Sequence, residues 1–111
     1  MQCEQLYVLY ASFIERYYGH DSLEASNVYF LMGLYYIEQQ FYGKANQCFK
    51  KAQLNREKKF GPLDPNVADC RYNIAIVFKK RGLLDKAIEE MSRALEARRG
   101  KNALSAAKAL E

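Results

Sequence analysis

The sequence predicts an all-α protein built as a solenoid of antiparallel helix pairs. Apolar residues recur at three- and four-residue steps along most of the chain, as on one face of an α-helix, and the strict alternation of a β-strand is absent. Residues 29–56 recur in similar form at residues 71–98, with the same 42-residue step that separates Gly19 from Gly61. A repeat of about 20 to 50 residues is typical of solenoids, in which each unit buries its apolar face only against its neighbours.

The composition fits a small, reduced, globular protein. Hydrophobic residues make up 50% of the 111 residues, and two prolines and six glycines are too few for a disordered chain. Three cysteines without CxxC spacing favour free thiols in a cytoplasmic protein over a disulfide scaffold or a zinc site. We expect neither a signal peptide nor a membrane span. The net charge of +4 permits an acidic partner but does not require one.

Capping residues and glycines divide the chain into helices. Gly19 ends the first helix, and Asp21 or Ser22 caps the second. The next turn is predicted at residues 39–43, and a fourth helix begins with Asp64 as its cap and proline in its first turn. The predicted helices cover residues 3–18, 23–39, 42–59, 65–81 and 85–99, with a short terminal helix at 103–110.

The repeat divides a single domain into about two and a half units. We predict a leading half-repeat or cap at 1–19, repeats at 20–61 and 62–100, and a terminal cap or tail at 101–111. Gly33 lies inside a helix, where glycine costs about 1 kcal/mol relative to alanine. The equivalent residue of the second copy is the small Ala75, so we expect a neighbouring helix to approach closely at this position.

Small and aromatic residues at matching positions carry a resemblance to a known family. Gly33, Ala45, Phe49 and Ala52 have the spacing of the signature of the tetratricopeptide repeat, and the second copy has Ala75, Ala87, Met91 and Ala94. The chain is therefore similar to that family. Residues 56–68, REKKFGPLDPNVA, further resemble the junction between kinesin light chain-type repeats. The 42-residue period and the absence of the usual terminal proline depart from the ordinary repeat.

The resemblance implies a peptide-binding groove on the concave face, lined by the first helix of each pair. The residues that it places there are Asn27, Phe30, Leu31, Leu34, Ile37 and Glu38 in the first repeat, and Asp69, Tyr72, Asn73, Ile76, Lys79 and Lys80 in the second. Asn73 is the best single candidate, because light chain-type repeats carry asparagine there and its amide both donates and accepts hydrogen bonds. The alternative is a surface asparagine bonded to water or to its own helix.

Other residues admit both a binding and a structural interpretation. Residues 79–81, Lys-Lys-Arg, either attract an acidic peptide or phosphate or form a solvated C-terminal turn that the helix dipole favours. Most tyrosines are predicted to belong to the core, but Tyr7 and Tyr10 on the end helix are candidates for contact with another repeat or subunit. The carboxylate-gripping residues of chaperone-binding members are absent, since Leu34 and Ile76 stand where asparagine is expected.

No pattern indicates chemistry. There is no nucleophile–base set, glycine-rich phosphate loop or pair of carboxylates, and His20 stands alone in a turn. We therefore expect no enzymatic activity, no cofactor and no metal.

Two functions remain open. The first is a protein–protein interaction module, an adaptor or scaffold that binds a peptide or protein. The second is an assembly unit whose end helices form a homo-oligomer or a segment of a longer cytoskeletal, ciliary or transport-associated solenoid. Basic residues are interleaved with acidic ones and form no stripe, so nucleic acid is not an expected partner.

Overall fold

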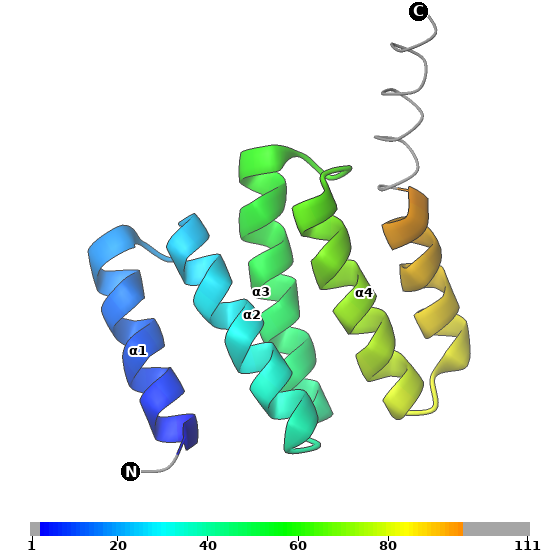
Figure 1. Cartoon of the computed structure of the whole chain (residues 1–111), viewed down its shortest axis with the longest axis horizontal. Helices are drawn as coiled ribbons and strands as arrows, with labels where there is room; N and C mark the ends of the chain where they lie inside the picture. Colours follow the sequence, from blue (N-terminus) through cyan, green and yellow to red (C-terminus); the bar gives the residue numbers. More distant parts are fainter. Residues whose placement is uncertain (1–2, 97–111) are drawn as a thin grey trace, which may run out of the picture.

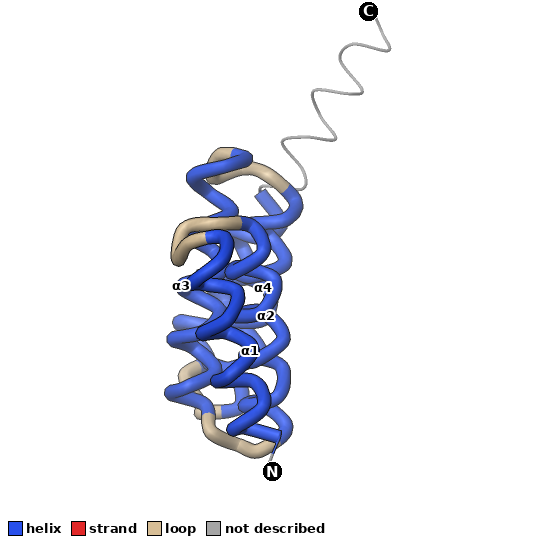
Figure 2. The backbone as a smooth tube through the Cα atoms, turned by 90° about the vertical axis from the view of Figure 1, so that its left-hand side faces the viewer, coloured by secondary structure: helices blue, strands red, loops and turns tan. Residues whose placement is uncertain are grey.

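The structure, a computed structural model, describes residues 3–96, which form a row of helices joined by short turns. The helices are α1 (Cys3–Tyr18), α2 (Leu23–Glu38), α3 (Tyr42–Phe60), α4 (Pro65–Lys80) and a fifth helix over residues 84–96. They lie side by side in chain order in Figure 1, and the turns gather at the two ends of the helices in Figure 2. The helix α1 packs on α2, α2 on α3, and α3 on α4. The prediction of an all-α solenoid is confirmed.

The predicted helix starts are present, and the structure decides which residue caps α2. The Ser22 hydroxyl, rather than Asp21, accepts a hydrogen bond of 3.0 Å from the backbone N–H of Ala25. The carboxylate of Asp64 accepts one of 2.9 Å from the N–H of Asn66, and Pro65 opens α4. Each cap satisfies an N–H group that has no partner within its helix.

The turn after α2 is shorter than predicted. It ends at Phe41, because Tyr42 and Gly43 already belong to α3. The residue in the left-handed region is Gln40, with φ of 64°, at the position equivalent to Gly82, with φ of 79°. Both turns close with the same pattern, in which the N–H of Phe41 bonds to the Tyr36 carbonyl and that of Leu83 bonds to the Phe78 carbonyl, each at 2.9 Å.

The core runs along the row of helices. Phe49 on α3 is its largest fully buried side chain and lies against Gly33 on α2. Ala45 and Ala52 of the signature are also fully buried, as are Ile74 and Val77 on α4. The predicted close approach at Gly33 is confirmed, and the ring of Phe49 is what approaches.

Two predictions for the tyrosines of the end helix are wrong, and those for the tail are not tested. Tyr7 packs inward against Tyr35, with ring centroids 5.3 Å apart, whereas Tyr17 and Tyr18 are exposed rather than part of the core. The physical reason is that α1 packs mainly on α2 among the described helices, so much of its surface is uncovered. The predicted terminal helix at 103–110 lies outside the described residues, and the boundaries at residues 19, 61 and 100 stay predictions.

Candidate functional site

The predicted groove residues of α2 lie mostly on its solvent-exposed side. Asn27, Leu31, Leu34 and Glu38 are exposed, and their three- and four-residue spacing places them on one side of the helix. This side combines two leucines with an amide and a carboxylate, so it offers apolar contact together with polar groups at its edges.

Phe30 and Ile37 are the exceptions on α2, since both are half-buried against the core, and the Phe30 ring is already engaged by other residues of the chain. It is half-buried and meets the ring of Phe49 edge-on, with centroids 5.5 Å apart. The Arg56 guanidinium lies 4.8 Å from its centroid, and the same group donates a 2.9 Å hydrogen bond to the Asn66 carbonyl. Phe30 therefore links α2 to the start of α4 and offers a partner only its rim.

On α4, the amide of Asn73 is partly occupied. Its Nδ2 donates a 2.9 Å hydrogen bond to the backbone carbonyl of Asp69, one turn earlier in the same helix. This is the self-bonded arrangement that the sequence left open. A peptide that uses Asn73 would bind the remaining acceptor or displace this bond, so the role of Asn73 in binding stays a prediction.

Three further groove residues of α4 line a shallow hollow beside the fifth helix. Tyr72, Ile76 and Lys79 lie on one side of it, and its volume is about 280 Å³. Its other lining residues are Ala75, Leu84, Ala87, Ile88 and Met91. We call this site the α4 hollow. Its walls are apolar except for the tyrosine hydroxyl and the Lys79 ammonium, which suits an apolar side chain with an acidic or polar neighbour.

The repeat explains why this hollow is open. Tyr72 and Ile76 are equivalent to Phe30 and Leu34, and the Phe30 side of α2 is linked by Arg56 to α4. No described helix follows the one at 84–96, and Tyr72 is exposed at the position where Phe30 is half-buried. Ile88 and Leu84 are accordingly 65% and 59% exposed although both are large and apolar. Exposed apolar patches are commonly found at protein–protein contact surfaces.

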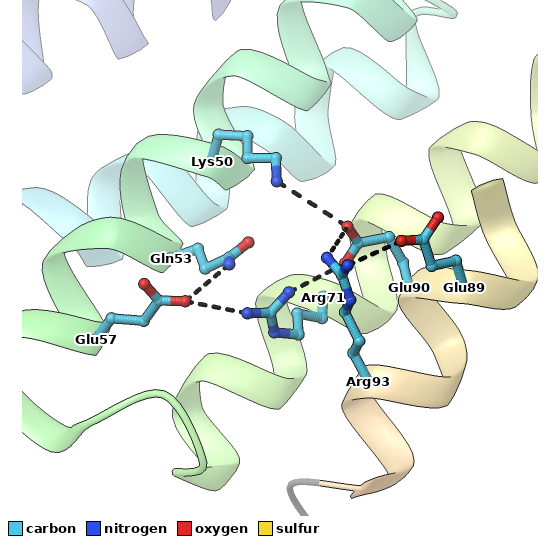
Figure 3. A network of polar contacts seen from close by, with 7 residues as sticks. All are labelled: Lys50, Gln53, Glu57, Arg71, Glu89, Glu90 and Arg93. Atoms are coloured by element: carbon cyan, nitrogen blue, oxygen red, sulfur yellow. Dashed lines mark hydrogen bonds and ion pairs between the residues drawn. The ribbon is translucent and has the colours of Figure 1, made fainter.

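A buried ion-pair network, which sequence reasoning missed, holds the walls of this region together. Figure 3 shows Arg71 on α4 between two carboxylates, with Glu57 of α3 at 3.2 Å and Glu90 of the fifth helix at 3.3 Å. The side chains of Arg71 and Glu90 are only 15% and 9% exposed. Gln53 donates a 2.9 Å hydrogen bond to Glu57, which orients that carboxylate.

The network has no equivalent in the first repeat, because Tyr29 stands in the place of Arg71. Comparison of the two repeats therefore indicates the network only through Arg71, which has no matching arginine in the first repeat. Its effect is structural, since it joins α3, α4 and the fifth helix and so positions the α4 hollow.

The described residues hold no group of histidine, cysteine and acidic side chains that would bind a metal. His20 pairs with Glu15, their side-chain atoms lying 2.6 Å apart in the turn after α1. Burial raises the pKa of the Cys70 thiol to about 11 and also raises that of Cys48, so neither thiol is activated as a nucleophile. Among residues 3–96, no helix is both long and apolar enough to cross a membrane.

Comparison with known families gives the fold its name. The family model of the tetratricopeptide repeat matches residues 24–100, which is more than half of the chain. The chain belongs to the tetratricopeptide repeat family. The match begins after α1, so it covers the two helix pairs and leaves the leading helix outside. Tetratricopeptide repeats generally mediate protein–protein interactions and are typically non-enzymatic. No curated protein matches the chain.

Proposed function

We propose that this tetratricopeptide repeat protein is a non-enzymatic adaptor or scaffold that binds a protein segment through the first helices of its repeats. The observation that supports it best is the α4 hollow, where three of the predicted groove residues meet four exposed or half-buried apolar residues of the fifth helix. The ligand is a peptide or helix that inserts an apolar side chain between Tyr72 and Ile88. An acidic residue beside that anchor pairs with Lys79 at the rim.

The exposed side of α2 extends this surface. Leu34 is 38% exposed and Leu31 48%, and Asn27 and Glu38 flank them. Asn73 and Lys80 would contact the peptide backbone and an acidic side chain between the two repeats. Phe30 and Asp69 hold this surface in place rather than contact the ligand. The Phe30 ring packs against the Arg56 guanidinium, and the Asp69 carbonyl accepts a hydrogen bond from Asn73.

The test is affinity capture from a native lysate with a matched pair of variants. Ile88→Glu places a charge in the hollow, and Leu95→Glu places the same charge on the same helix outside it, at a similar exposure of 65% and 60%. We expect at least a tenfold loss of a specific partner with Ile88→Glu and with the double variant Asn73→Ala, Lys79→Ala. Leu95→Glu should retain it. Equal capture by all of these variants would overturn the proposal.

Three finer assignments belong to the same proposal. Residues 56–68 support repeats of the kinesin light chain type, and three unpaired thiols, Cys3, Cys48 and Cys70, support a cytoplasmic location. Nucleic acid is not a proposed partner, because several cations are paired with acids, including Lys44 with Glu4. A shift of any oligonucleotide at low salt would contradict this last assignment.

The second candidate function is assembly through the end helices. The exposed apolar side of α1 favours this function, and the spacing of its side chains indicates how two copies would pack.

A further inference from the structure

The outer side of α1 is a row of large apolar side chains. Leu6, Leu9, Tyr10, Phe13 and Tyr17 lie at three- and four-residue steps, apart from the adjacent Leu9 and Tyr10, and are between 51% and 73% exposed. We call them the α1 stripe. The neighbouring side of the helix carries Ala11 and Ile14, which are buried against α2. A helix that is apolar on two sides has packing partners on both sides.

The repeat shows what covers this side of a helix elsewhere in the same chain. A 42-residue step places Leu9 and Phe13 on Lys51 and Asn55 of α3. The Lys51 ammonium lies 5.4 Å from the centroid of the Tyr29 ring on α2. Asn55 is 6% exposed, and its Nδ2 donates to the backbone carbonyl of Ser22, which caps α2, at 3.2 Å.

The equivalent side of α3 is therefore the side that α2 covers, as an antiparallel partner (Figure 1). The α1 stripe is the same surface without such a partner among the described residues. Where α3 has polar or small side chains, α1 has large apolar ones, since Tyr10 replaces Ala52 and Phe13 replaces Asn55. The stripe thus matches an apolar, aromatic helix face.

We propose that a second copy of this chain covers the stripe, with the two α1 helices packed antiparallel across a twofold axis. A twofold axis perpendicular to a helix places that helix antiparallel to its copy, which is the relation that α2 and α3 already have. The stripe contains no charged residue, so its association with itself buries no charge and opposes none. The ring centroids of Phe13 and Tyr17 lie 4.7 Å apart and form a continuous aromatic surface for this contact.

The register follows from the ends of the stripe. Leu6 and Tyr17 are its first and last members, so in an antiparallel pair Leu6 of one copy meets Tyr17 of the other, and Tyr10 meets Phe13. Five half-exposed large side chains bury about 100 Å² each, or roughly 1,000 Å² over both copies, which is the lower limit for a specific interface. We therefore expect a reversible dimer with a Kd of about 1 to 100 µM.

This inference rests on the second proposed function, and its failure is distinguishable from failure of the groove. The first measurement is the mass of the 111-residue chain by light scattering and sedimentation over the concentrations that bracket this Kd. Phe13→Glu, at a side chain 54% exposed, should give a monomer at all of them, with an unchanged far-UV circular dichroism spectrum. Leu95→Glu, 60% exposed on the fifth helix, is the matched control and should still dimerise.

A cross-linking measurement tests the antiparallel register. In a Cys3→Ser background, a chain with Leu6→Cys is mixed with one that carries Tyr17→Cys and both are oxidised. We expect the mixed disulfide to form at least tenfold faster than the disulfide between two Leu6→Cys chains, because those positions lie about 16 Å apart along an antiparallel pair.

Four outcomes would overturn the proposal. They are a monomer at every concentration, a dimer that survives Phe13→Glu, rapid self-cross-linking of Leu6→Cys, or masses above a dimer that fall with Leu95→Glu. The last would indicate head-to-tail stacking of the two ends. The first three leave unchanged the partner capture that Ile88→Glu and Leu95→Glu compare.

Discussion

The ring of Phe49 occupies the space that a side chain at Gly33 would take. A Cβ atom at position 33 would lie 2.6 Å from both Cε1 and Cζ of Phe49, closer than any stable contact. The two residues are thus one packing unit that joins α2 to α3. At the two equivalent positions the second repeat has a different pair, Ala75 and Met91.

Gly33→Ala is therefore expected to destabilise the protein by about 1–2 kcal/mol, because overpacking outweighs the gain in helix propensity. The double variant Gly33→Ala, Phe49→Met copies the pair of the second repeat and should lose less than the sum of the two single changes. Urea unfolding of the four proteins measures this coupling. Additive losses would show that the two positions do not pack as a unit.

Gln40 holds a left-handed conformation that its repeat equivalent, Gly82, adopts without steric cost. Gln40→Gly should raise the free energy of unfolding by about 1 kcal/mol. The converse change, Gly82→Gln, should lower it by a similar amount and serves as the matched control. Thermal unfolding followed by circular dichroism measures both. A loss of stability with Gln40→Gly would mean that contacts of the glutamine side chain outweigh the backbone cost.

Arg71 pairs with two carboxylates that are largely shielded from water. Arg71→Met should destabilise the protein by roughly 2–4 kcal/mol, because it leaves Glu90 buried without its closest cation. Arg93→Met removes a cation whose side chain is 52% exposed and should cost less than about 1 kcal/mol. Denaturant midpoints of the two variants provide the comparison, and equal losses would contradict a special role for Arg71.

Two tyrosines, Tyr29 and Tyr36, are expected to ionise only at high pH. Burial raises the pKa of Tyr29 to about 12, and burial together with the hydrogen bond to Glu4 raises that of Tyr36 to about 12. The unfolded value is about 10. Because the folded state holds these protons more tightly, the stabilisation is complete below about pH 10 and is lost as the pH rises toward 12.

Absorbance at 295 nm should accordingly show a late group of tyrosine ionisations near pH 12, to which Tyr29 and Tyr36 contribute. Tyr36→Phe should remove one tyrosine from the later group. A single transition near pH 10 with native circular dichroism would contradict this expectation.

The three thiols should differ in reactivity, because they differ in burial. Cys3 is exposed, Cys48 is half-buried and Cys70 is fully buried with a pKa raised to about 11. Iodoacetamide near pH 8 should modify Cys3 first and Cys70 only when the core opens. Peptide mass spectrometry over time measures the order. Modification of Cys70 as fast as Cys3 would indicate that α4 is not held in the core.

The sequence by itself determined the elements and their packing signature. Its 42-residue step and the small residues at Gly33, Ala45 and Ala52 predicted paired helices, and Asp64 predicted the start of α4. Such features are local, because caps act within one turn and periodicity acts along one helix, so a single sequence contains them. The groove residues were predicted from the family resemblance, and the sequence itself supports only their helical spacing.

Only the tertiary structure decided which side of each helix faces which neighbour. In the structure, Tyr7 faces the core and Tyr17 faces solvent. Asn73 bonds to the backbone of its own helix, and Arg71 lies between Glu57 and Glu90. The rotation of a helix about its axis and the pairing of charges on different helices depend on packing between distant segments. Local spacing does not encode these relations, and both the α4 hollow and the open side of α1 arise from them.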